Sequence, residues 1–224
     1  MQIITPLQHH LLELLSNRSE REAFYLSGGT ALSAFYLKHR LSRDLDLFTG
    51  EEELIRPFSI AFEKLANESG TSVERKRSFS SFVELVVSSE KETTIVQFAL
   101  DSPFRLEPVV KCHEIPGLMI DSLPDLAANK TLALFGRAAL RDFIDVYCLA
   151  TTTFSKADLL EKAAKKDPGF NLYWYGVALA QIETFVENDP DFQLLLERIT
   201  FEKLQQFMIN WQKEISASLH SDSS

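Results

Sequence analysis

The chain has 224 residues, of which 45% are hydrophobic and 25% are charged, a composition typical of a folded globular protein. Its formal charge of -9 excludes a broad basic surface for nonspecific nucleic-acid binding, so any such contact has to be local. The two cysteines, Cys112 and Cys148, have no metal-ligand spacing, and no apolar run approaches the roughly 18 residues that span a bilayer. We therefore expect a cytoplasmic protein that does not engage a membrane.

Apolar periodicity and turn residues divide the chain into two parts. In the first part, the pattern predicts a helix over 6–16, a strand over 23–26, a helix over 31–40, a strand over 45–48 and a helix over 54–68. Residues 71–100 are rich in β-formers and predict a hairpin or meander. From Leu123 the pattern is helical, with later helices expected at about 156–166, 171–187 and 191–217.

The first candidate site lies where the first predicted strand runs into two glycines. Ser27-Gly28-Gly29-Thr30 stands between a strand and a helix, so the backbone can approach a ligand closely and the positive end of a helix faces an anion. Asp44 and Asp46 lie two apart in the next strand, which sends both carboxylates to the same face. Two like charges side by side favour a cation between them, and Mg²⁺ takes carboxylate and phosphate oxygens. The pattern therefore predicts a site for a metal and a phosphate.

The order strand, Gly-Gly, helix, strand with Asp-x-Asp resembles the signature of DNA polymerase β-like nucleotidyltransferases. More narrowly, the chain is similar to the AbiEii/AbiGii-type nucleotidyltransferase toxin family over about residues 20–150. The first matching block consists of Gly28-Gly29-Thr30-Ala31-Leu32, Arg40, Ser42 and Arg43-Asp44-Leu45-Asp46-Leu47-Phe48. The second resembles the family's Lys…Arg…Arg-Asp-x-x-Asp segment and consists of Lys130, Arg137 and Arg141-Asp142-Phe143-Ile144-Asp145.

The resemblance implies an α+β fold, in which a small mixed β-sheet flanked by helices is followed by an all-helical carboxy-terminal part. The expected domains are an α/β domain at residues 1–120 and a helical domain at 121–224 that completes the active-site cleft. The implied reaction is transfer of a nucleoside monophosphate from an NTP to an acceptor, with Mg²⁺ or Mn²⁺ as cofactor. The family's toxin character makes tRNA or another RNA an expected acceptor and a cognate antitoxin an expected partner.

The residues and the resemblance together give a set of predicted site residues. Catalytic roles are assigned to Asp44, Asp46, Lys130 and Asp142. Nucleotide binding is assigned to Ser27, Gly28, Gly29, Thr30, Arg43, Lys130 and Arg137. Metal binding is assigned to Asp44, Asp46 and Asp101.

The second block also has a geometric interpretation. On one continuous helix, Lys130, Arg137 and Arg141 would fall within about 40° of one another and form a cationic stripe. Such a stripe neutralises charge on phosphate oxygens. Asp142 would lie about 120° from Lys130, so its place in the site rests on the resemblance alone. The alternative is an ordinary helix ion pair between Arg141 and Asp145.

The chain departs from the wider superfamily at the third carboxylate. The segment 94–101 offers the neutral Gln97 where an acid is expected, and Asp101, four residues later, shares its strand parity. Asp101 is therefore the candidate, although Asp101-Ser102-Pro103 also has the composition of a turn, and Glu84 is the weaker alternative. Two firm carboxylates are enough to hold one Mg²⁺.

Two other functions stay open at the level of the sequence. Gln97 is compatible with a degenerate fold that binds nucleotides without transferring them. The acidic composition suits a small cationic acceptor, such as an aminoglycoside, better than RNA. An RNA acceptor would need a local basic patch, for which the candidates are Arg75, Lys76 and Arg77 and, later in the chain, Lys162, Lys165 and Lys166.

Overall fold

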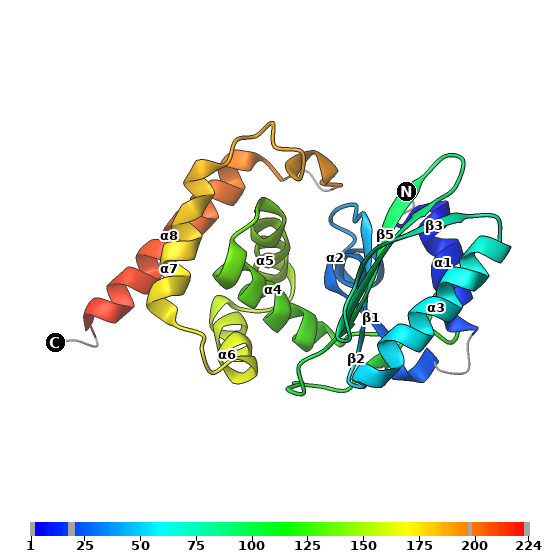
Figure 1. The fold of residues 1–224 in the computed structure, drawn as a ribbon. Coiled ribbons are helices and arrows are strands. Elements are labelled where there is room, and N and C mark those ends of the chain that lie inside the picture. The colour runs from blue at the N-terminus through cyan, green and yellow to red at the C-terminus, as the bar shows by residue number, and fades with distance from the viewer. Residues whose placement is uncertain (1–2, 18–20, 197–198, 222–224) are drawn as a thin grey trace. The chain divides into compact units, whose positions relative to one another are not determined.

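The computed structural model describes residues 3–17, 21–196 and 199–221. The chain divides into two compact units, Met1–Ser122 and Leu123–Ser224 (Figure 1). The first unit contains the β-sheet and the second is helical, so the predicted α+β fold class is confirmed. No helix among the described residues is long and apolar enough to cross a membrane.

A seven-stranded mixed sheet organises the first unit, with the strand order β3-β4-β5-β2-β1-β7-β6. Its strands are β1 (Tyr25–Ser27), β2 (Asp44–Thr49), β3 (Ser72–Ser78), β4 (Phe82–Ser88), β5 (Thr93–Leu100), β6 (Val110–Lys111) and β7 (Met119–Ile120). The central strand β2 is antiparallel to β1 and parallel to β5. The predicted meander over residues 71–100 is confirmed as β3, β4 and β5, whereas β6 and β7 were not predicted.

The helices of the first unit are α1 (Pro6–Ser16), α2 (Gly28–Leu32), which continues into a π-helical segment at Ser33–Leu37, and α3 (Glu52–Glu68). Helices α1 and α3 lie on one face of the sheet (Figure 1). Phe58 and Phe62 of α3 pack against Phe98 of β5, with ring centroids 5.6 and 5.5 Å apart. Because strand side chains alternate, this apolar packing directs the polar residues of β2 and β5 to the opposite face.

The helical unit contains α4 (Leu123–Arg137), α5 (Leu140–Thr152), α6 (Lys156–Lys166), α7 (Leu172–Ala180) and α8 (Phe201–Ser221). The helix through the second sequence block is not continuous, because Ala138 has a φ of 47° and Ala139 is extended. Gly136 stays inside α4, so the break follows the glycine instead of occurring at it. The expected helix from about residue 191 was also placed too early, since α8 begins at Phe201 after a short 3₁₀ turn.

Candidate functional site

The glycine turn after β1 packs directly against β2. Gly28 has a φ of +69°, a left-handed conformation that favours glycine. A Cβ atom added to Gly28 would lie 2.1 Å from Oδ2 of Asp46, and one added to Gly29 would lie 2.6 Å from Nη2 of Arg40. No side chain fits at either position without displacing these groups. The turn therefore holds bare backbone against a carboxylate on one side and a guanidinium on the other.

The two aspartates of β2 lie on the same face of the strand. Asp44 and Asp46 are half-buried, and they alternate with Leu45 and Leu47, which are buried in the core. The hydroxyl of Thr30 donates to the backbone carbonyl of Asp44, which ties α2 to β2. The structure thus brings the predicted glycine turn and the predicted aspartate pair together.

Strand register places four polar residues side by side across the sheet. Ser27 of β1 is paired with Asp46 of β2, Asp46 with Gln97 of β5, and Gln97 with Glu84 of β4. We call these four residues the Asp46 row. The neutral Gln97 is consequently the β5 neighbour of Asp46, and the carboxylate of Glu84 lies one strand further away.

Glu84 is held by two donors at the far end of the Asp46 row. Its carboxylate accepts from Nε and Nη2 of Arg77 at 3.0 and 2.5 Å, and from Nε2 of Gln97 at 2.9 Å. The Arg77 guanidinium, with a smaller contribution from Gln97, holds the pKa of the Glu84 carboxyl below its usual range, although burial acts in the opposite direction. Glu84 is therefore a carboxylate at neutral pH.

Asp101 lies apart from the Asp46 row. It follows the last residue of β5, four residues beyond Gln97, which corresponds to about 13 Å along a strand. Its backbone N–H donates to the carbonyl of Thr49 at 2.8 Å, and its carboxylate accepts from the hydroxyl of Tyr25. Burial and the hydrogen bond to Asp101 raise the pKa of the Tyr25 hydroxyl. Among the described residues, no group of three or more His, Cys, Asp or Glu side chains has a geometry that could hold a metal ion.

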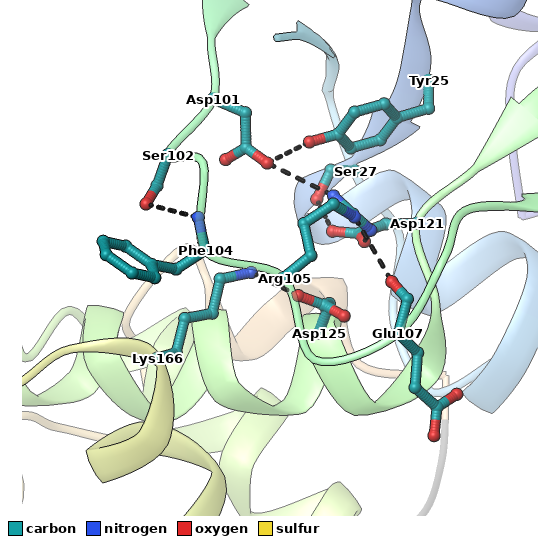
Figure 2. A network of polar contacts seen from close by, with 10 residues as sticks. All are labelled: Tyr25, Ser27, Asp101, Ser102, Phe104, Arg105, Glu107, Asp121, Asp125 and Lys166. Atoms are coloured by element: carbon teal, nitrogen blue, oxygen red, sulfur yellow. Dashed lines mark hydrogen bonds and ion pairs between the residues drawn. The ribbon is translucent and has the colours of Figure 1, made fainter.

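A polar network anchors the residue before the glycine turn (Figure 2). Arg105 donates to Asp101 at 3.2 Å and to Asp121 at 2.5 Å, and its guanidinium lies 4.6 Å from the centre of the Tyr25 ring. Asp121 is buried, and its other carboxylate oxygen accepts from the Ser27 hydroxyl at 2.6 Å. Asp121 and Arg105 were not among the predicted site residues. No local pattern marks them, because Ser27 and Asp121 are 94 residues apart in the chain.

The predicted residues of the helical unit form two separate ion pairs. Nζ of Lys130 lies 2.7 Å from Oδ2 of Asp145, and Arg137 donates two hydrogen bonds of 2.7 Å to Asp142. Both carboxylates are fully buried, so each pair fastens α4 to α5. The expected stripe of Lys130, Arg137 and Arg141 on one helix is wrong, because the break at Ala138 separates Arg141 from the other two.

The two basic runs considered for RNA binding are occupied by partners within the chain. On β3, Arg75 lies 2.7 Å from Glu63, Lys76 lies 2.6 Å from Glu74, and Arg77 is bound by Glu84. On α6, Lys165 pairs with Glu161, the buried Lys166 pairs with Asp125 at 2.6 Å (Figure 2), and Lys162 lies over the ring of Phe154. Arg43, from the first sequence block, is exposed just before β2.

Comparison with known proteins finds a family model that matches nearly the whole chain. Residues 10–221 match the family model described as nucleotidyl transferase AbiEii toxin, type IV TA system. Three solved structures share the fold: a nucleotidyltransferase candidate from H. pylori, JHP933 from Helicobacter pylori, and MenT4, a nucleotidyltransferase toxin from Mycobacterium tuberculosis H37Rv.

Their similarity is distant in sequence. The first has a TM-score of 0.64 at 19% identity and covers 96% of this chain and 94% of its own. JHP933 has a TM-score of 0.60 at 20% identity, and the match covers 97% of this chain and 95% of JHP933. MenT4 has a TM-score of 0.59 at 19% identity, and the match covers 92% of this chain and 81% of MenT4. No curated protein matches the chain at a significant level.

Proposed function

Because the chain belongs to the AbiEii nucleotidyltransferase toxin family, we propose that it transfers a nucleoside monophosphate from an NTP with the help of a divalent metal held by Asp44 and Asp46. Family membership supports the reaction class, and the metal, the nucleotide contacts and the acceptor are our proposal. The observation that carries it is the close approach of the Gly28 backbone to Asp46. A turn that admits no side chain, beside two carboxylates on one strand face, suits a phosphate and the metal that accompanies it.

The donor set fits Mg²⁺ or Mn²⁺. Asp44 and Asp46 supply hard carboxylate oxygens, and Mg²⁺ typically takes one or two protein carboxylates and completes its shell with phosphates and water. When bound, the metal would neutralise charge that develops on the transferring phosphoryl group. Neither aspartate needs help from Asp101 under this proposal, since Asp101 is engaged by Tyr25 and Arg105.

The chain's own residues would then position the nucleotide. The backbone of Gly28, Gly29 and Thr30 would line the triphosphate, with Ser27 held in place by Asp121. In the helical unit we assign charge neutralisation to Lys130 and Arg137 and a catalytic role to Asp142, on the strength of the family motif. Arg43, exposed beside Asp44, is a further candidate for the nucleotide.

An RNA acceptor and a cognate antitoxin are the partners we propose, because the matching family is a toxin–antitoxin family. A small cationic acceptor is the second candidate, and the pairing of both basic runs with acidic residues or a ring favours it. An acidic chain whose basic runs are internally neutralised attracts a cation more readily than a polyanion.

The test is a transfer assay with each labelled NTP. Wild-type protein and a variant carrying Asp44→Asn and Asp46→Asn would be incubated with total RNA, with total protein and with an aminoglycoside panel. We expect label on one acceptor class with wild type and none with the variant. Nucleotide binding without transfer to any acceptor would instead identify a binding module.

A further inference from the structure

We propose that Gln97 supplies a neutral oxygen ligand, Oε1, beside Asp46, and that Glu84 and Arg77 are positioning residues that fix the direction of its amide. The proposal rests on the proposed function, because Oε1 would bind the metal assigned to Asp44 and Asp46. It concerns residues outside the two blocks that match the family. The observation behind it is the chain of hydrogen bonds from Arg77 on the edge strand β3 through Glu84 to Gln97, whose register partner on the central strand β2 is Asp46.

The first step is the position of Gln97. Parallel pairing with Asp46 and antiparallel pairing with Glu84 put the three side chains on one face of the sheet, next to one another. The Asp46 carboxylate lies against Gly28 on the β1 side, whereas the Gln97 amide nitrogen reaches Glu84 on the β4 side. Gln97 thus stands between the aspartate site and the Arg77–Glu84 ion pair.

The second step is the direction of the amide. A carboxylate can only accept hydrogen bonds, and a glutamine amide donates only through its nitrogen. Glu84 is ionised, so the nitrogen of Gln97 must face it at 2.9 Å and the oxygen Oε1 must face elsewhere. Arg77 binds the same carboxylate through two nitrogens, which prevents Glu84 from turning away.

The third step is what this atom supplies. Oε1 is an uncharged carbonyl oxygen, a type of ligand that suits Mg²⁺ and Mn²⁺. It adds no charge, so the protein's charge at the metal would still come from the two carboxylates of Asp44 and Asp46. It cannot take up a proton near neutral pH, so Gln97 would bind the metal and does not act as a base. Glu84 and Arg77 orient this ligand from outside the metal's coordination shell, and residues in that role typically affect metal affinity by about 10- to 100-fold.

The test is Mn²⁺ binding measured by electron paramagnetic resonance, without nucleotide and without an activity readout. Gln97→Leu removes Oε1 and should weaken Mn²⁺ binding about tenfold or more. Glu84→Leu should do the same, because it removes the acceptor that holds Nε2 of Gln97 and lets the amide rotate. Nη2 of Arg77 and Nε2 of Gln97 donate to the same oxygen, Oε2 of Glu84, so a single oxygen at position 84 can serve both donors.

A conservative variant separates this mechanism from a structural one. Glu84→Gln loses the charge but keeps one oxygen that can accept from both Nη2 of Arg77 and Nε2 of Gln97, so Mn²⁺ affinity should stay within about threefold of wild type. If these residues only stabilised the sheet, loss of the ion pair with Arg77 would weaken binding in both Glu84 variants. Glu63→Leu is the matched control, because Glu63 of α3 forms an ion pair with Arg75 of β3 outside the Asp46 row.

The outcomes are distinguishable from those of the proposed function. If wild type binds Mn²⁺ through Asp44 and Asp46, while Gln97→Leu binds it equally well, the assignment of Gln97 is wrong and the proposed function stands. If Glu84→Leu binds Mn²⁺ as wild type does, or if Glu84→Gln loses as much affinity as Glu84→Leu, the locked-amide mechanism is wrong. If wild type binds no Mn²⁺ at this site, both proposals are overturned. Circular dichroism and melting curves confirm folding of each variant.

Discussion

The backbone of Gly28 lies so close to Asp46 that a methyl group at position 28 would come within 2.1 Å of the Asp46 carboxylate oxygen Oδ2. The glycine turn and the aspartate pair are therefore not independent features that happen to share a sheet. The position of one sets the position of the other, because β1 and β2 are paired at this point through Ser27 and Asp46. A ligand bound by one feature would contact the other.

This contact makes Gly28→Ala more harmful than backbone strain alone. We expect left-handed strain to cost about 1–2 kcal/mol and the displaced Asp46 carboxylate to weaken NTP binding by about tenfold or more. Gly70→Ala is the matched control, since Gly70 has a φ of +91° and open space around the added atom. Urea unfolding and nucleotide titration measure the two effects. Equal loss of stability with unchanged nucleotide affinity in both variants would show that the contact with Asp46 is irrelevant to binding.

Asp142 allows the predicted catalytic role to be separated from an ion-pair role. Asp142→Asn preserves volume, and we expect it to reduce transfer tenfold or more, roughly 1.4 kcal/mol in the barrier. Asp125→Asn is its control, because Asp125 is equally buried and pairs with Lys166 in the same helical unit. We expect the two variants to lose similar amounts of stability. Only Asp142→Asn should reduce transfer. If transfer falls equally in both, Asp142 is a structural residue.

Local signals explain which parts of the fold and the site could be predicted. A strand that ends in two glycines and a strand with alternating Asp and Leu each have a short-range pattern, so β1, β2 and the Gly28–Asp46 neighbourhood were expected. The break after α4 had no such signal. Gly136 was the residue expected to interrupt this helix, but it stays inside α4, and alanine is a good helix former, so the φ of 47° at Ala138 had no specific signal.

Long-range contacts account for what the sequence did not reveal. Arg105 reaches Asp121 and Asp101 from a segment with little regular structure, and the pairing of Ser27 with Asp121 spans most of the first unit. Strand parity put Asp101 in phase with Gln97, but Asp101 follows the last residue of β5, and parity carries no information about distance along a strand. The ion pairs that occupy both basic runs depend on which elements pack together, and charge counting cannot show them.

The lowered pKa of Glu84 predicts a pH dependence of stability. Its pKa is lower in the folded chain than in the unfolded chain, where a glutamate titrates near about 4.3. The stabilisation is thus complete above that value and is lost as the pH falls through the lowered folded pKa. Unfolding free energies of wild type and Glu84→Gln, measured from neutral pH to about pH 3, should converge on the acid side. Parallel curves over this range would contradict the assignment.

Charge reversal at the two lysines at the end of α6 should change stability to very different extents. Lys166 is buried against Asp125, so Lys166→Glu puts a carboxylate beside a buried carboxylate and should cost about 3 kcal/mol or more. Lys165→Glu affects only an exposed pair with Glu161 and should change stability by less than about 1 kcal/mol. Thermal unfolding measures both. A stable Lys166→Glu variant with reduced RNA binding would restore this run as a nucleic-acid contact.

Calorimetric titration of a non-hydrolysable NTP analogue, with Mg²⁺ and with a chelator, tests the central claim most directly. The proteins would be wild type, a variant with Asp44→Asn and Asp46→Asn, and a charge-matched control with Glu52→Gln and Glu53→Gln on the exposed first turn of α3. The account predicts Mg²⁺-dependent binding in wild type and the control, and a loss of about tenfold or more in the aspartate variant. Binding that is independent of Mg²⁺ and unchanged by the loss of both aspartates would contradict it.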